Sequence, residues 1–177
     1  SLLIVVVSPI LLFVIMLQKI TEPKGEVFLR QKRLPQFNRS FVVFKFRSHK
    51  TKYNGMRPEE AFEKMGKPNL AKEYRRNGDF LQDDPRISNL GKFLRITSLD
   101  ELPQLFNVVR GDLSRVGPRA LIPEELEQYH EKHHILSVKS GMTGLAQVSG
   151  RRNLSFEERR KLDVYYVQNW SFWLDIV

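Results

Sequence analysis

The chain has 177 residues, of which 41% are hydrophobic, and this content is enough to bury one core in a single domain. Its 29 Lys and Arg residues exceed its 20 Asp and Glu residues, and the formal charge of +9 suits an anionic partner. Nucleic acid, an anionic phospholipid surface and a phosphorylated substrate all meet that condition. The absence of cysteine excludes disulfides and thiolate metal sites, and it fits a reducing compartment such as the cytoplasm.

Residues 2–17 form an uncharged apolar run, LLIVVVSPILLFVIML, in an otherwise polar chain. As a helix this run is about 24 Å long, which is short for a simple membrane span of roughly 20 residues. Pro9 removes a backbone donor, so we expect a kink there, with the Ser8 hydroxyl helping to satisfy the freed backbone groups. These features favour a bent, re-entrant membrane helix over residues 1–20.

A signal peptide is the alternative for this run. However, no basic segment precedes it and no small-residue cleavage site follows it. Because the sequence begins and ends within apolar runs, we also expect it to be cut at both ends.

Two strand-like runs follow, at residues 26–33 and 41–47, and they predict a β-hairpin. In the second run one face is apolar and the other carries the Lys45 cation. Residues 57–78 are densely charged, with Pro68 separating two short predicted helices, and we interpret them as a solvated insert.

Three further helices are predicted in the second half of the chain. The first runs over residues 99–110 and is closed by Gly111, and the second runs over residues 123–136. The last begins at Ser155, where Ser155 and Glu158 have the spacing of a capping box. This last helix mixes aromatic and basic side chains, which is typical of a helix in the lipid headgroup layer, although a buried aromatic stripe is the alternative.

Asp100 and Glu101 are adjacent carboxylates at a predicted helix start. Ser98 and Glu101 also fit a capping box, and acidic residues in a first turn are favoured by the helix dipole, so a purely structural role is open. Pro103 fits that role poorly, since it leaves a backbone carbonyl of the first turns without its usual donor. Local inconsistency of this kind tends to persist where function requires it.

Cations are frequent in the segments around these carboxylates: Lys45, Arg47, Arg86, Arg95, Arg110, Arg115 and Arg119. Each alone could be a solvated surface charge. Together they would keep a carboxylate ionised, and an ionised Asp can attack phosphorus as a nucleophile. A second carboxylate can hold Mg²⁺, and arginines can clamp a diphosphate.

The sequence resembles the monotopic polyprenol-phosphate phosphoglycosyl transferases, also called bacterial sugar transferases. The motifs that carry the resemblance are FKFRS (44–48), DPRI (84–87), LR (94–95), TSLDELPQL (97–105), GDLS (111–114), VGPR (116–119), TGLAQVSGR (143–151) and DVYY (163–166), with Trp170 and Asp175. The Ser8–Pro9 step and residues 27–33 also resemble the family's re-entrant helix and its exit.

The resemblance implies an α+β fold that is mainly helical and monotopic, with a re-entrant, Pro-broken membrane helix (1–20), a small antiparallel β-hairpin and amphipathic interfacial helices. Residues 21–177 would form a catalytic domain facing the cytoplasm, with an insert at about 49–83. The location would be the cytoplasmic face of the bacterial inner membrane, on anionic phospholipid. A homo-oligomer is left open.

The resemblance also implies an activity in two steps. Asp100 would attack the sugar-bearing phosphorus of a UDP-sugar, release UMP and form a phosphosugar-aspartyl intermediate, which undecaprenyl phosphate then attacks. Glu101, with Asp100, would bind Mg²⁺, and Asp175 would assist the acceptor step. Arg119 would hold a phosphate, and the roles of Lys45, Arg47 and Arg95 would be phosphate or headgroup contacts.

Three positions depart from the family pattern. Ala120 and Ser140 stand where proline is usual, and His49 stands where methionine is common. Ala120 could loosen the loop that presents Arg119. The insert resembles that of members that transfer galactose or glucose.

Three other functions compete with this one. The basic, aromatic-rich composition is compatible with a nucleic-acid-binding module, which leaves the apolar run unexplained. A non-catalytic membrane adaptor could share the scaffold. His130, His133 and His134 could hold a metal, although the flanking Glu and Lys residues indicate a solvated helix face.

Overall fold

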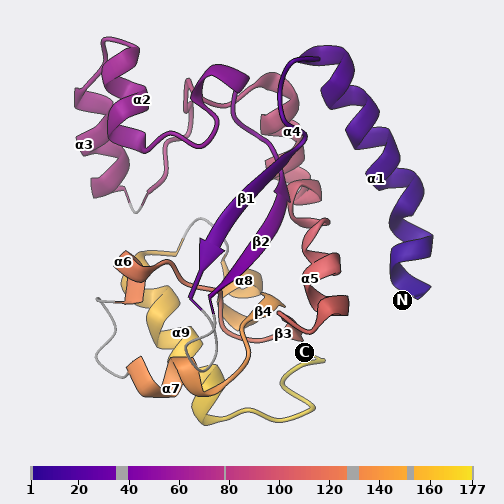
Figure 1. Ribbon diagram of the computed structural model, residues 1–177. Coiled ribbons are helices and arrows are strands. Elements are labelled where there is room, and N and C mark those ends of the chain that lie inside the picture. Colours follow the sequence, from indigo (N-terminus) through magenta and orange to yellow (C-terminus); the bar gives the residue numbers. More distant parts are fainter. Residues whose placement is uncertain (1, 35–39, 78, 127–131, 151–153, 177) are drawn as a thin grey trace. The chain divides into compact units, whose positions relative to one another are not determined.

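The computed structural model describes residues 2–34, 40–77, 79–126, 132–150 and 154–176 (Figure 1). The chain forms two compact units. The first comprises residues 1–29 and 45–103, and the second comprises residues 30–44 and 104–177. The class is α+β, as predicted, and the described residues form mostly short helices and two small sheets.

The first unit begins with α1 (Leu2–Thr21), a helix of 20 residues that contains Pro9. Pro9 has no N–H, so the Val5 carbonyl loses its helical donor, and the Ser8 hydroxyl donates to this carbonyl at 2.7 Å. The predicted role of Ser8 is therefore confirmed. The helix continues through Pro9, and the bend and re-entrant path stay predictions.

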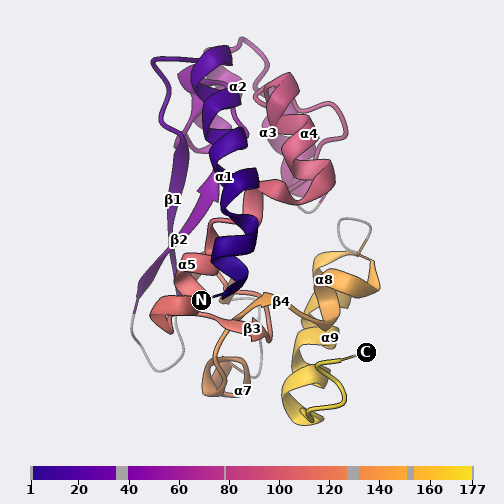
Figure 2. The ribbon, with the colours of Figure 1, turned by 90° about the vertical axis from the view of Figure 1, so that its right-hand side faces the viewer.

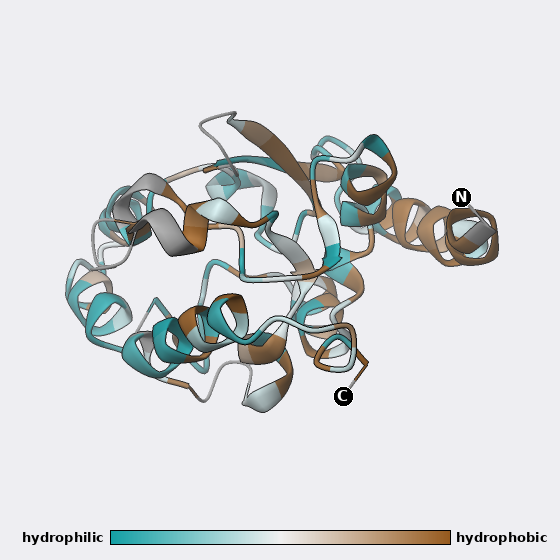
Figure 3. Ribbon diagram, turned by 90° about the horizontal axis from the view of Figure 1, so that it is seen from below, coloured by the Kyte–Doolittle hydropathy of each residue, from teal (hydrophilic) through white to brown (hydrophobic). Residues whose placement is uncertain are grey.

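By length and composition, the segment Leu3–Thr21 can cross a membrane, with a mean hydropathy of 2.5. Figure 3 shows α1 as hydrophobic around most of its circumference. Leu11 and Val14 are buried with Phe46 and Leu94 in the core of the first unit. The large apolar side chains of α1 that remain exposed are Leu3, Val5, Val6, Ile10, Leu12, Phe13, Met16 and Ile20. One face of α1 thus packs on protein, while the rest offers an apolar surface suited to lipid.

The predicted hairpin is confirmed: β1 (Phe28–Arg33) pairs with β2 (Phe41–Phe46) (Figures 1 and 2). Phe28 and Phe46 stack with ring centroids 5.4 Å apart. Val43 and Phe46 are both buried, although residues three apart on a strand face opposite sides. Both faces of β2 therefore bury a side chain, including the face that carries Lys45.

Two short helices of the insert are confirmed as α2 (Pro58–Lys64) and α3 (Asn69–Arg76). The insert is not merely solvated, however, because Phe62 of α2 is fully buried. The Arg86 guanidinium lies 4.4 Å from the centroid of the Phe62 ring and 4.5 Å from that of the Tyr74 ring. Its nitrogens bind the buried Asp84 carboxylate, with Nη2 at 2.6 Å from Oδ2. The two aromatic faces thus attach the insert to the DPRI segment, and Asp84 of that segment holds the Arg86 guanidinium in place.

The DPRI segment leads into α4 (Asn89–Thr97), which the sequence analysis did not predict as a separate helix. Ser88 caps it by accepting a hydrogen bond from the Gly91 N–H at 3.0 Å. A 3₁₀ turn, η3 (Leu99–Glu101), follows α4, and a short 3₁₀ turn, η2 (Thr51–Tyr53), follows β2.

The second unit begins its helical part with α5 (Gln104–Arg110), which Gly111 closes with a φ of 81°, as predicted. A parallel pair, β3 (Ser114–Val116) and β4 (Gly141–Thr143), places Ser114 opposite Gly141. A Cβ on Gly141 would lie 2.2 Å from the Gly117 nitrogen, so this close approach requires glycine.

The remaining helices are α6 (Pro123–Leu126), α7 (Lys132–Ser137), α8 (Leu145–Ser149) and α9 (Phe156–Gln168). Figure 2 shows α8 and α9 side by side. The single helix predicted over 123–136 has α6 and α7 at its ends, and 127–131 lie outside the described residues. The Ser155–Glu158 capping box at the start of α9 is confirmed. α9 ends at Gln168, so the aromatic residues from Trp170 onward follow the helix instead of sharing it.

His49 gives the first unit a pH-dependent stability. Burial, with the nearby charges of Arg95 and Arg86, lowers the pKa of His49 from 6.5 to about 4, and Asp84 only partly opposes this. The unfolded chain takes up a proton below pH 6.5, whereas the folded chain does so only near pH 4. Acid therefore favours the unfolded state across this window.

We expect this group to lower the free energy of unfolding by up to about 1.4 kcal/mol per pH unit as the pH falls. His49→Met removes the titrating ring at similar volume. Thermal unfolding in detergent between pH 7 and pH 5 should show a smaller fall in Tm for the variant than for the parent. Equal falls would contradict the assignment.

Candidate functional site

The backbone around Asp100 and Glu101 explains how Pro103 is accommodated so close to the two carboxylates. Ser98 adopts the left-handed conformation, with a φ of 58°, and its side chain caps no helix. The carboxylates then lie in η3, whose turn is closed by the Glu101 N–H donating to the Ser98 carbonyl at 3.1 Å. Pro103 stands just before α5, where its missing donor costs little. The capping-box interpretation of Ser98 and Glu101 is therefore wrong, as is the single helix over 99–110.

The two carboxylates have different surroundings. Asp100 is buried, with 9% of its surface exposed. The Glu101 side chain is 38% exposed, and its Oε1 accepts a hydrogen bond from the Lys45 Nζ at 2.7 Å. Lys45 comes from β2 of the same unit, 56 residues away in sequence. The site thus presents one shielded carboxylate beside one that is accessible and paired with a cation.

The other predicted cations of this unit are held by the protein. The Arg95 Nε donates to the Ser48 hydroxyl at 2.9 Å, which joins α4 to the end of β2. The Arg47 guanidinium is buried and donates to the Glu22 carboxylate at 2.5 Å and to the Glu26 carbonyl at 2.6 Å. The phosphate or headgroup roles predicted for both residues remain predictions.

Arg47 also fixes the end of α1. The Gln18 side-chain amide donates to the Arg47 carbonyl at 2.8 Å, and the Arg47 guanidinium also donates to the Thr51 hydroxyl at 2.8 Å. Burial raises the pKa of Glu22, but hydrogen bonds from Thr51 and Arg47 outweigh it and hold that pKa below its usual value. An ionised Glu22 carboxylate therefore faces the Arg47 guanidinium directly after the end of α1.

Glu101 is the residue best suited to hold the predicted magnesium ion. Mg²⁺ in phosphoryl-transfer sites commonly takes one or two carboxylates and completes its coordination with water and substrate phosphates. The described residues contain no group of three or more His, Asp or Glu side chains that could form an all-protein metal cage. An accessible single carboxylate fits this open kind of site. His130 lies outside the described residues, so the predicted histidine cluster is not tested.

The second unit holds Arg119 and Asp175. The Arg119 Nη2 lies 3.2 Å from the Glu125 Oε1. The backbone N–H of Arg119 donates to the carboxylate of the buried Asp163 at 3.4 Å. Glu125 also pairs with the buried Arg33 at 3.5 Å, and Arg33 Nη1 donates to the Ala120 carbonyl at 3.2 Å. Ala120 thus lies in a loop that a cation from β1 holds.

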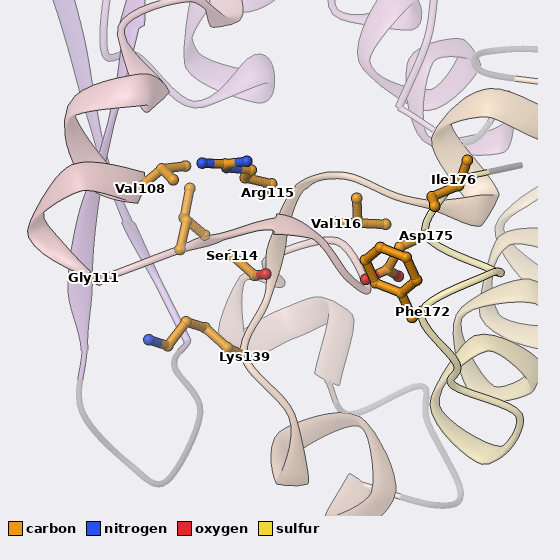
Figure 4. Close-up of a pocket in the computed structure, with 10 residues that line it drawn as sticks. Val108, Gly111, Ser114, Arg115, Val116, Lys139, Phe172, Asp175 and Ile176 are labelled. Atoms are coloured by element: carbon orange, nitrogen blue, oxygen red, sulfur yellow. The ribbon is translucent and has the colours of Figure 1, made fainter. Parts of the chain in front are cut away.

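Asp175 accepts a hydrogen bond from the Tyr166 hydroxyl at 2.6 Å. Burial, together with this bond and the charge of Asp175, raises the pKa of Tyr166. Asp175 also lines a pocket of about 580 Å³ in the second unit, together with Arg115 and Lys139 (Figure 4).

The structure therefore brings Lys45, Asp100 and Glu101 together in the first unit, and it places Arg119 and Asp175 in the second. Sequence reasoning missed the partners of the predicted site residues: Ser48 for Arg95, Glu22 for Arg47, Glu125 and Asp163 for Arg119, and Tyr166 for Asp175. Asp163 and Tyr166 stood within the DVYY motif, which was the one available signal for them.

Known proteins resemble this chain along its whole length. The family model described as bacterial sugar transferase matches residues 1–177. The undecaprenyl-phosphate galactose phosphotransferase of Salmonella typhimurium is 39% identical over 97% of this chain and 35% of its own length. The UDP-glucose:undecaprenyl-phosphate glucose-1-phosphate transferase of Klebsiella pneumoniae is 37% identical over 99% of this chain and 36% of its own. The exopolysaccharide production protein ExoY of Sinorhizobium fredii is 40% identical over 98% of this chain and 75% of its own length. The chain thus spans about a third of the first two relatives.

The Lys45–Glu101 pair can be tested by a double-mutant cycle. We expect Lys45→Met and Glu101→Gln each to lower the free energy of unfolding. The double variant should lower it by less than the sum of the two single effects. The coupling should be about 0.5–1 kcal/mol, since both side chains are partly exposed. Thermal unfolding at low and high salt measures it, and the coupling should shrink at high salt. Strict additivity would show that the pair is absent in solution.

Proposed function

Since this chain belongs to the bacterial sugar transferase family, we propose that it moves a sugar-1-phosphate from a UDP-sugar to undecaprenyl phosphate. The observation that carries the proposal is the η3 turn, where a buried Asp100 stands beside the accessible, lysine-paired Glu101. Two of the relatives are named for this kind of transfer, one for galactose and one for glucose. A hexose of that type is therefore the favoured donor sugar.

In the first step an Asp100 carboxylate oxygen attacks the phosphorus that bears the sugar. A P–O bond forms to Asp100, the phosphoanhydride bond to the nucleotide breaks, and UMP leaves with that electron pair. Burial of Asp100 strips it of much of its water, which strengthens it as a nucleophile and limits hydrolysis of the acyl phosphate.

In the second step a phosphate oxygen of undecaprenyl phosphate attacks the same phosphorus. The bond to Asp100 breaks, the carboxylate is regenerated, and a polyprenyl diphosphate sugar is released. One phosphoanhydride has replaced another, so no outside energy source is needed and positioning and charge neutralisation are the catalytic tasks.

Charge in this site would be balanced by a magnesium ion held through Glu101, which neutralises diphosphate oxygens when bound. Lys45 holds the Glu101 carboxylate in place from β2. Arg119, in the second unit, is the candidate for an additional phosphate contact.

The exposed apolar surface of α1 supports a place in the membrane. We propose that α1 lies in the cytoplasmic leaflet of the bacterial inner membrane in a re-entrant path, on anionic phospholipid that the +9 charge favours. This position would bring the η3 turn to the headgroup layer, where the phosphate of a very apolar lipid must lie.

The test is UMP release from UDP-galactose and UDP-glucose without any acceptor. We expect a Mg²⁺-dependent burst of at most one UMP per enzyme, and full turnover only after undecaprenyl phosphate is added. Asp100→Asn should abolish the burst, because an amide cannot act as the nucleophile. Glu101→Gln should weaken it and raise the Mg²⁺ concentration that it requires.

Asp112→Asn is the matched control, since it changes an Asp to Asn within the GDLS motif outside the dyad. A burst that survives Asp100→Asn would overturn the proposal. Absence of UMP with every donor sugar would favour a non-catalytic adaptor.

A further inference from the structure

The pocket in the second unit combines positive charge with an apolar wall. Its lining comes from the end of α5 and the turn after it, from β3, from Lys139 before β4 and from the segment after α9. Figure 4 shows Arg115 beside Val108 on one side and Asp175 beside Phe172 on the other. The pocket is an open depression of about 580 Å³, which is large enough for a phosphate group and the first part of a hydrocarbon chain.

The polar part of this pocket is suited to an anion. Arg115 and Lys139 are both exposed, and neither forms an ion pair with another residue in the part of the chain that the structure describes. Asp175 is the one carboxylate of the lining, and the Tyr166 hydroxyl already binds it. Two cations against one carboxylate leave the lining positive, and the Ser114 hydroxyl adds a hydrogen-bond donor.

The apolar part of the pocket continues onto exposed hydrophobic surface. Phe172 and Ile176 of the lining are 67% and 61% exposed. Trp173, next to Phe172 in sequence, is 74% exposed. Large exposed apolar side chains beside cations suit a ligand with an anionic head and a hydrocarbon chain, whereas a nucleotide has no apolar chain for such a wall.

We propose that this pocket binds the acceptor, a polyprenyl phosphate monoester. Arg115 and Lys139 bind its phosphate, and the wall formed by Phe172 and Ile176 contacts its first isoprene units. The assignment rests on the proposed function. It gives Asp175 a location at the acceptor phosphate and assigns Arg115 and Lys139 to a step for which the sequence analysis named no cation.

The experiment separates the two half-reactions. We expect Arg115→Gln and Lys139→Gln each to raise the KM for undecaprenyl phosphate by about tenfold, which corresponds to losing about 1.4 kcal/mol of charged hydrogen bonding. The UMP burst without acceptor and the KM for the UDP-sugar should not change. Lys139→Arg should restore most of the acceptor affinity, since it keeps the charge.

Lys32→Gln is the matched control, because Lys32 is an exposed cation of the same unit outside the pocket lining. The burst amplitude reports the fraction of folded enzyme in each variant. An unchanged KM for the acceptor with a normal burst would overturn the assignment, and so would a burst that slows in parallel with turnover. Absence of a burst in the parent enzyme would instead overturn the proposed function.

Discussion

The buried guanidinium of Arg47 joins the last turn of α1 to the end of β2. The guanidinium binds Glu22, which directly follows α1, together with the Glu26 carbonyl and the Thr51 hydroxyl, and the Gln18 side-chain amide of α1 donates to the Arg47 backbone carbonyl. Removing the partly exposed Glu22 would leave the charge of the buried Arg47 guanidinium without its carboxylate partner, which is unfavourable away from water. An apolar helix that suits lipid is therefore fixed to the strand that supplies Lys45.

The rest of the first unit extends from this attachment. Lys45, two residues before Arg47, donates a hydrogen bond to the Glu101 carboxylate. Ser48, the residue after Arg47, accepts a hydrogen bond from Arg95 of α4. The helix α4 and the η3 turn are consecutive in the chain, so Ser48, just after β2, binds the last turn of α4, and Lys45 of β2 binds the η3 turn that follows. The insert stabilises the approach to α4 through Arg86, whose guanidinium lies against two aromatic rings and Asp84. The apolar helix α1 and the proposed nucleophile Asp100 thus belong to one packed unit.

Features that depend on local spacing could be predicted from the sequence. The Ser8–Val5 bond follows from the position of Pro9, the Ser155–Glu158 box from residues three apart, and the hairpin from two alternating runs. The missed features join distant residues: Lys45 to Glu101, Arg47 to Glu22 and Phe62 to Arg86. The helix predicted over 99–110 failed because a helical pattern cannot reveal the left-handed Ser98, which ends α4 and starts a 3₁₀ turn. Chemistry at Asp100 was suggested by residue types, whereas its burial required the fold.

The covalent intermediate on Asp100 is tested most directly by the mass of the enzyme after brief mixing with a UDP-hexose and Mg²⁺ in the absence of acceptor. We expect an adduct of one hexose phosphate, located by fragmentation to the peptide that contains Asp100, and its loss when undecaprenyl phosphate is added. UMP release with no adduct, or an adduct on another residue, would contradict it.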